Sequence, residues 1–325
     1  MVAKTKDELC RKLSECEHIA LTSDGWTDDF RKVSYVTVTA HYFDSDLNLQ
    51  SCILDTSAVE ERKTAEVLAN TVENVINSFG FDYSKVTIVT DNAANMIAAF
   101  RGRCCRVSCF AHCLNLVVTD MLAIDNADFQ SMITNCKVLV RHFKHTGLQR
   151  KLPRTLKQEC PTRWNSTYTM LDAVLAQYEE IHDVLNERKE LKYLYAVDKD
   201  VLVSVVSLLV HFKNASEKAC ADSHPTLQFV VPVCHKLMTA ACKDEDSDSD
   251  VVRDLKSTAR QALKSKVRLH VLHDVAAFLN PTMKGLTFIP PTRKKAAMEY
   301  VTRMVASLPV TSQNAVAANS TEVNT

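Results

Sequence analysis

The stretch Val86-Thr87-Ile88-Val89-Thr90-Asp91-Asn92 is a short run of apolar and β-branched residues that ends in two polar ones. Such a run is typical of a strand in the middle of a sheet that is covered on both faces. We therefore expect a strand over Val86–Thr90, with Asp91 at its carboxyl end. Helical spacing of apolar residues predicts a helix over Glu61–Phe79 before this strand, and another is expected over Asn92–Phe100 after it.

Earlier residues predict three more strands, the first of which also runs into a carboxylate. His18–Thr22 is an apolar run that leads to Asp24. Ser34–Phe43 is rich in β-branched and aromatic residues, and Leu49–Thr56 follows after a short turn, so neighbouring strands should pair as antiparallel hairpins. A fifth short strand is expected over Arg106–Phe110.

Strand patterns nearly vanish after residue 111, and five long helical segments follow. They are His112–Phe143, Ser166–Glu190, Asp200–Ala221, Phe229–Ala241 and Val252–Phe278. Mixed strands followed by many helices predict an α/β fold that carries an all-helical region. The expected divisions are an N-terminal helix over 1–17, an α/β core over 18–111, a helical region over 112–305 and a disordered tail over 306–325. The acidic segment Lys243–Asp250 is expected to be a solvated loop.

The composition narrows the class of protein. Apolar residues make up 46% and charged residues 24% of the 325 residues, which is typical of a soluble globular protein. Lys+Arg and Asp+Glu both number 39, so the overall charge gives no argument for nucleic-acid binding. No secretory h-region follows Met1, and the apolar run at Val201–Val210 is too short to span a bilayer. We expect no membrane partner and no secretion, and the twelve cysteines should be reduced thiols.

Asp24 and Asp91 are the candidate catalytic residues. If the first and fourth strands are neighbours in the sheet, the two carboxylates converge at its edge. Close carboxylates repel each other unless a cation lies between them, and Mg²⁺ prefers such oxygen ligands. Metal ions in this setting stabilise the attacking and leaving oxygens of a phosphodiester. The alternative is that both residues are helix N-caps or turn formers, as aspartate often is.

Several blocks, in this order, resemble the hAT superfamily of transposases and, among its relatives, animal zinc finger BED domain-containing proteins. The blocks are Leu21–Thr27 (LTSDGWT), Val89–Met96 (VTDNAANM), Cys109–Leu116 (CFAHCLNL), Thr162–Thr167 (TRWNST) and the weaker Ala276–Lys284 (AAFLNPTMK). The resemblance implies an RNase H-like mixed sheet interrupted by a large helical insertion. It also implies that Asp24 and Asp91 match the first two acids of the family's Asp-Asp-Glu set, with Mg²⁺ as the cofactor.

The resemblance is incomplete. The family's third acid lies in a C-terminal segment beside the dimerisation element, and neither Glu299 nor Glu322 has that context. The two-Cys, two-His BED finger has no counterpart either. The resemblance implies a transposase-derived nuclear protein with a DNA-binding or transcription-regulatory role. The departures predict that it is catalytically inactive or a fragment. Homodimers are expected in the family, but the matching segment is absent. The alternatives are part of an active metal-dependent transposase for DNA cleavage and strand transfer, and a helical protein-interaction module.

Two further motifs carry expectations. Arg163 and Trp164 match the family's Arg-Trp pair, which implies phosphate binding and stacking on a flipped base. The alternative is a tryptophan packed in the helical core. Cys109 and His112 have half of a zinc-site spacing, and the resemblance makes them a structural element near the active site. No complete zinc site is expected in this chain, because a second pair of ligands is not evident.

A local cluster of positive charge is the other candidate for DNA binding. It lies between two expected helices and consists of Lys144, Arg150, Lys151, Arg154 and Lys157. Lysine and arginine side chains on such a loop neutralise backbone phosphates. The alternative is an ordinary solvated loop.

Overall fold

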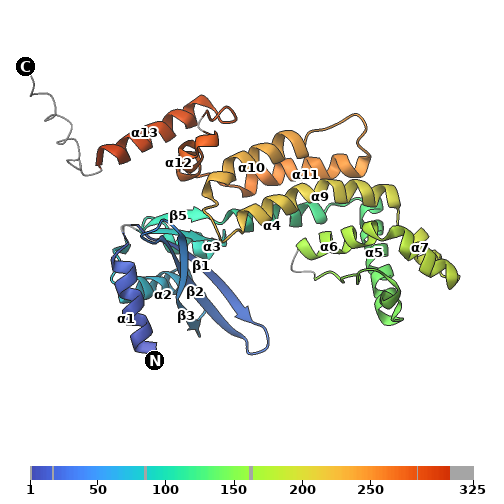
Figure 1. The fold of residues 1–325 in the computed structure, drawn as a ribbon, viewed down its shortest axis with the longest axis horizontal. Helices are drawn as coiled ribbons and strands as arrows, with labels where there is room; N and C mark the ends of the chain where they lie inside the picture. Colours follow the sequence, from blue (N-terminus) through green and yellow to red (C-terminus); the bar gives the residue numbers. More distant parts are fainter. Residues whose placement is uncertain (1, 17, 84–85, 161–163, 284, 308–325) are drawn as a thin grey trace, which may run out of the picture.

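A computed structural model describes residues 2–16, 18–83, 86–160, 164–283 and 285–307. A short helix, α1 (Val2–Ser14), precedes a five-stranded sheet. The strands are β1 (Ala20–Asp28), β2 (Val33–Phe43), β3 (Leu49–Val59), β4 (Thr87–Thr90) and β5 (Cys105–Ser108). They lie in the order β3-β2-β1-β4-β5, in which β1, β2 and β3 are antiparallel and β4 and β5 run parallel to β1 (Figure 1). This confirms the predicted RNase H-like mixed sheet.

The first strand is longer than its apolar pattern indicated. β1 continues from Ala20 to Asp28, because β2 pairs with it as far as the partners Asp28 and Val33. Asp24 therefore lies inside β1 and not after it. The expectation of a strand ending at Thr22 was wrong because cross-strand pairing extends the strand through polar residues that carry little β signal of their own.

Two helices cover one face of the sheet. α2 (Ala65–Ser78) and α3 (Ala94–Phe100) contribute residues to a single buried cluster with β1, β2 and β4, for example Leu68 and Met96 with Leu21, Val38 and Ile88. Alternate residues of the strands point into this cluster, which fixes the face that each side chain occupies. The helices thus determine that Leu21 and Ser23 face the core, whereas Thr22 and Asp24 face the other side.

The helical region follows β5 and has its own core. Its elements are α4 (Phe110–Leu122), α5 (Ala127–His145), η2 (Leu148–Lys151), α6 (Trp164–Ala176), α7 (Tyr178–Glu187), α8 (Lys192–Tyr195), α9 (Lys199–Ala219), η3 (Leu227–Phe229), α10 (Val230–Lys236), the π-helical turn η4 (Leu237–Ala241) and α11 (Asp250–Lys266). One large buried cluster joins residues from α4 to α11. Figure 1 shows α4, α9 and α11 running side by side away from the sheet.

The expected long helices are divided by caps. His112–Phe143 is two helices, because the side chain of Asn126 accepts a hydrogen bond from the Phe129 backbone N–H and begins α5. Val252–Phe278 is divided in the same way between α11 and α12 (Val271–Leu279), where His270 forms a capping box. Apolar periodicity predicts that helices exist, but local hydrogen bonds set where they end.

The chain returns to the sheet after the helical region. α12, η5 (Pro281–Met283) and α13 (Pro291–Ser307) lie above β5 in Figure 1, and α13 was not expected from the sequence. The expected tail over 306–325 falls outside the described residues from 308 onward. None of the helices in the described parts of the chain is long and apolar enough to cross a membrane.

Candidate active site

The two candidate acids are neighbours at the point where the pairing of β1 with β4 ends. β1 and β4 pair in parallel from Ala20 and Thr87 to Ser23 and Thr90. Asp24 and Asp91 directly follow the paired segments of β1 and β4, so the pairing places their backbones side by side. β1 and β4 are neighbouring strands, which was the condition for the two carboxylates to converge.

The two carboxylates differ in their surroundings. Asp24 is exposed, and within the described residues its carboxylate has no hydrogen bond or ion pair. Asp91 is half-buried, and its Oδ1 accepts a hydrogen bond from the Ala93 backbone N–H at 3.0 Å, just before α3 begins. Asp91 therefore does form the turn that the alternative interpretation predicted, while its second carboxylate oxygen has no protein donor among these contacts. Turn formation and metal binding are compatible at this residue.

A divalent cation fits this donor set in part. Two carboxylates supply the hard oxygen ligands that Mg²⁺ prefers, and it commonly keeps several waters. Within the described ranges no group of three or more His, Cys, Asp or Glu side chains is arranged to hold a metal ion. Asp24 and Asp91 could thus supply two ligands, with the remaining positions left to water or phosphate.

Arg106 on β5 is a site residue that the sequence analysis missed. Its Nε donates to the Thr90 hydroxyl at 2.8 Å, and its guanidinium donates to the Asn92 side-chain oxygen at 2.9 Å and to the Asp91 carbonyl. Burial lowers the pKa of Arg106, and the nearby Asp91 carboxylate acts in the opposite direction. The guanidinium therefore fixes the segment that carries Asp91. An arginine inside an otherwise apolar strand was the available signal.

Cys109 and His112 lie where β5 passes into α4. Burial raises the pKa of the Cys109 thiol, the backbone N–H groups of His112 and Ala111 lower it, and nearby Cys220 and Asp24 raise it further. In the next turn, the Asn92 amide donates to the Cys113 sulfur at 3.1 Å, and burial raises the pKa of that thiol to about 11. These contacts join the loop after β4 to α4, beside Asp24.

Two family models match consecutive parts of the chain. The ZBED1 RNase-like domain matches residues 22–105, which include Asp24 and Asp91, and the ZBED1 RNase-like helical domain matches residues 107–207. The chain thus carries a hAT transposase- and ZBED-like RNase H-like domain followed by a helical domain, with distant homology to Hobo transposase and ZBED proteins. The boundary between the two matches falls at β5, where the structure passes from the sheet to the helical region.

Curated relatives of this family cover most of the chain. The Transposable element Hobo transposase of Drosophila melanogaster is 26% identical over 275 residues, which cover 83% of this chain and 42% of the relative. Zinc finger protein 618 of Mus musculus is 26% identical over 268 residues (79% and 27%). Zinc finger BED domain-containing protein 6 of Homo sapiens is 25% identical over 256 residues (70% and 26%). The chain spans less than half the length of each of these relatives.

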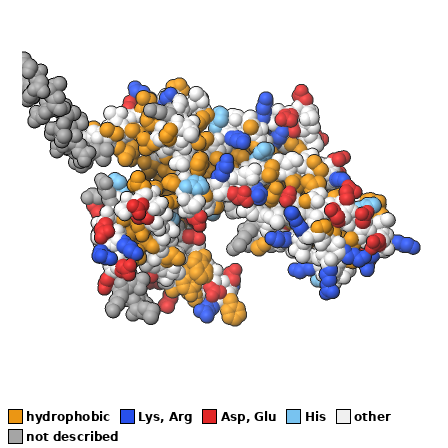
Figure 2. Space-filling view, viewed as in Figure 1, with side chains coloured by type: hydrophobic (Ala, Val, Ile, Leu, Met, Phe, Trp, Pro, Cys, Tyr) orange, Lys and Arg blue, Asp and Glu red, His pale blue; other side chains and the backbone are white. Residues whose placement is uncertain are grey.

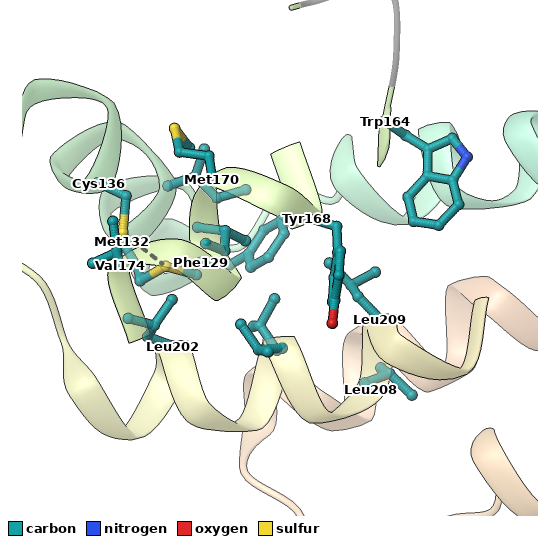
Figure 3. Packing of buried hydrophobic residues seen from close by; sticks show 14 of the residues in the cluster. Phe129, Met132, Cys136, Trp164, Tyr168, Met170, Val174, Leu202, Leu208 and Leu209 are labelled. Atoms are coloured by element: carbon teal, nitrogen blue, oxygen red, sulfur yellow. Dashed lines mark hydrogen bonds between the residues drawn. The ribbon is translucent and has the colours of Figure 1, made fainter. Parts of the chain in front are cut away.

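The Arg-Trp pair of the hAT family is only partly described. Arg163 lies outside the described residues. Trp164 is 5% exposed and belongs to the helical core with Tyr168 of α6 and Leu209 of α9 (Figure 3). This position corresponds to the alternative in which the tryptophan packs in the core. Stacking of Trp164 on a base requires the side chain to leave that core.

The basic residues of this hAT-like chain lie far from the two acids. Lys144, Arg150, Lys151, Arg154 and Lys157 are all exposed, in and after the end of α5. Figure 1 shows α5 at the end of the helical region that points away from the sheet, and Figure 2 shows blue side chains in that part of the molecule. Lys151 pairs with Glu187 at 2.6 Å, and the other four have no ion pair within the described residues. We refer to these five side chains as the basic tip.

Proposed function

We propose that this chain is a DNA-binding core derived from a hAT transposase, which binds a DNA phosphate through a cation held by Asp24 and Asp91 and does not perform strand transfer by itself. The observation that carries the proposal is the pairing of β1 and β4, which ends one residue before both acids. A nuclear, regulatory role is part of the proposal, in line with relatives that are named as zinc finger proteins.

Each side chain has a distinct role in this proposal. The exposed Asp24 carboxylate is open to a cation and to DNA. The Ala93 N–H orients Asp91, and Arg106 fixes its backbone. The cation, when bound, supplies Lewis-acid polarisation of a phosphate oxygen. The basic tip provides the remaining phosphate contacts.

A second function is favoured by the state of Asp24. Its carboxylate is exposed and free of described partners, so the pair remains suited to metal binding in an active transposase that gains its third acid from elsewhere. In that case the same two side chains would bind the cations used for DNA cleavage and strand transfer.

Metal binding and DNA cleavage test both functions. Purified chain is titrated with Mn²⁺ by calorimetry, alone and with duplex DNA carrying terminal inverted repeats, and cleavage is followed on gels. We expect Mn²⁺-enhanced DNA binding that is lost in Asp24→Ala and Asp91→Ala but kept in the control Asp46→Ala, whose carboxylate lies in an exposed turn. No cleavage is expected. Metal-dependent nicking abolished by Asp24→Ala would favour the active transposase, and Mn²⁺ binding unchanged in both variants would refute the role of the pair.

A further inference from the structure

The β1–β2 hairpin carries unusually exposed aromatic side chains. Phe30 at its tip is 95% exposed, and Trp26 on β1 is 46% exposed. Trp26 is the register partner of Tyr35 on β2, and their rings are stacked with centroids 4.5 Å apart and planes inclined by 21°. In Figure 2 hydrophobic side chains stand out on the hairpin that projects at the lower edge of the sheet. Large apolar groups left in water in this way often mark a binding surface.

This aromatic pair shares a face of the sheet with Asp24. Side chains alternate along a strand, so residues two apart point the same way. Gly25, between Asp24 and Trp26, faces α3, because a Cβ placed there would lie 3.5 Å from the Met96 side chain of that helix. Asp24 and Trp26 therefore both point away from α3. Tyr35 lies beside Trp26 on that face, so the stacked rings begin two residues beyond the acid.

Hydrogen bonds stabilise the turn of the hairpin, and a lysine side chain contacts β1 close to that turn. The Asp28 carboxylate accepts hydrogen bonds from the backbone N–H groups of Phe30 at 2.9 Å and Arg31 at 3.1 Å. The Lys63 ammonium donates to the Trp26 carbonyl at 3.2 Å and to the Thr27 hydroxyl at 3.0 Å. Lys63 has no carboxylate partner within the described residues, so its positive charge remains available to a phosphate.

We propose that Trp26 and Tyr35 form a stacking platform for an unpaired nucleobase of DNA. The proposal rests on the proposed function, because the phosphate next to that base would lie at Asp24. A base laid on Trp26 would continue the stack that Tyr35 begins, and Lys63 would contact the adjoining phosphate. Base stacking on aromatic rings tolerates any sequence, since every base has a π-face. Trp164 is buried, whereas Trp26 is accessible beside the acids without any rearrangement.

The two tryptophans allow a direct optical test. Trp26 and Trp164 are the only tryptophans in the chain, and they differ sharply in exposure. In Trp164→Phe the emission comes from Trp26 alone, and in Trp26→Phe from Trp164 alone. Single-stranded oligothymidylate should quench the Trp26 emission of Trp164→Phe strongly and the Trp164 emission of Trp26→Phe hardly at all. Because Trp164→Phe alters the core, wild-type protein is also photo-cross-linked to DNA containing 5-iodouracil, and the attached residue is mapped by mass spectrometry.

Binding of the same oligonucleotide by anisotropy completes the experiment. Trp26→Ala should weaken binding about tenfold or more, which is the usual effect of losing one stacked base. Phe43→Ala is the matched control, because Phe43 is 48% exposed at the opposite end of β2. The affinity of this variant for the oligonucleotide should equal that of the wild type. DNA binding with unaltered Trp26 emission and no cross-link to Trp26 or Tyr35 would overturn this inference and leave the proposed function intact. No binding of duplex or single-stranded DNA would overturn both.

Discussion

Ser23 of β1 and Thr90 of β4 are register partners with buried side chains, but only the Thr90 hydroxyl is hydrogen-bonded. The Thr90 hydroxyl donates to the Asp91 carbonyl at 2.9 Å and accepts from Arg106 at 2.8 Å. The Ser23 hydroxyl has no partner within the described residues. Ser23 and Thr90 directly precede the two acids, and their hydroxyls should thus affect the stability of the fold in opposite directions.

We predict opposite effects on stability from removing these two hydroxyls. Ser23→Ala should leave the free energy of unfolding unchanged or raise it by up to about 1 kcal/mol, because a buried hydroxyl without a partner is costly. Thr90→Val should lower it by about 1–3 kcal/mol, because the Arg106 guanidinium then loses an acceptor. Urea denaturation measures both. A loss of stability in Ser23→Ala as large as that in Thr90→Val would show that Ser23 has a partner in solution.

The sequence predicted the sheet well for a physical reason. The strand at Val86–Thr90 is wholly apolar or β-branched, which is typical of a strand covered on both faces of a sheet. The extension of β1 through Asp24 to Asp28 could not be predicted, because it depends on pairing with β2. The acidic segment 243–250 is exposed as expected, except at Asp248. Asp248 within it forms an ion pair with Lys256 at 2.7 Å in which both side chains are almost fully covered, and no local pattern reveals that partner.

The candidate site could be predicted only where adjacent residues determine it. Asp91 follows from the strand end at Thr90 and Asp24 from the apolar run before it, although β1 continues past Asp24. The pairing of β1 with β4 brings the two residues together. Arg106 stands out as an arginine in a short strand, but the sequence does not reveal its partners Thr90, Asp91 and Asn92. The exposure of Trp26 and the burial of Trp164 were equally hidden, because exposure depends on which elements cover a residue.

Arg106 should act as a positioning residue for Asp91. Arg106→Met removes the hydrogen bonds to Thr90 and Asn92, so we expect about 2–3 kcal/mol less stability. Mn²⁺ affinity should fall about tenfold or more, as is usual when a group that orients a metal ligand is removed. Arg103→Met is the control, since Arg103 pairs with Glu73 at the surface and should contribute little. Stability loss without any change in Mn²⁺ affinity would leave Arg106 with a structural role only.

The basic tip should account for part of the salt dependence of DNA binding. We expect each lost phosphate contact to reduce the slope of log K against log salt by about 0.9. Lys144→Ala, Arg150→Ala, Arg154→Ala and Lys157→Ala should therefore each flatten the slope. Lys151→Ala should do so less, because Lys151 pairs with Glu187. Anisotropy titrations at several salt concentrations measure the slope, and an unchanged slope in the fourfold variant would place the DNA elsewhere.

His273 at the start of α12 is a buried, uncharged histidine. Its Nδ1 accepts the His270 backbone N–H at 2.8 Å. Burial lowers the pKa of His273 to about 4, nearby His270 and Arg293 lower it further, and the His270 backbone hydrogen bond and Asp274 act in the opposite direction. Because this pKa lies below the ordinary value of about 6.5, the folded state favours the neutral ring.

The stability of the chain should therefore depend on pH through His273. Above about pH 6.5 the ring is neutral in both states and its contribution is complete. As the pH falls toward about 4, the unfolded chain takes up a proton that the folded chain does not, and unfolding becomes easier by up to about 1.4 kcal/mol per pH unit. His273→Asn retains an acceptor near the position of Nδ1 but does not titrate. Urea midpoints between pH 7 and pH 4.5 should fall less steeply in this variant than in the wild type. Parallel curves for the two proteins would mean that His273 takes up its proton equally in the folded and unfolded states.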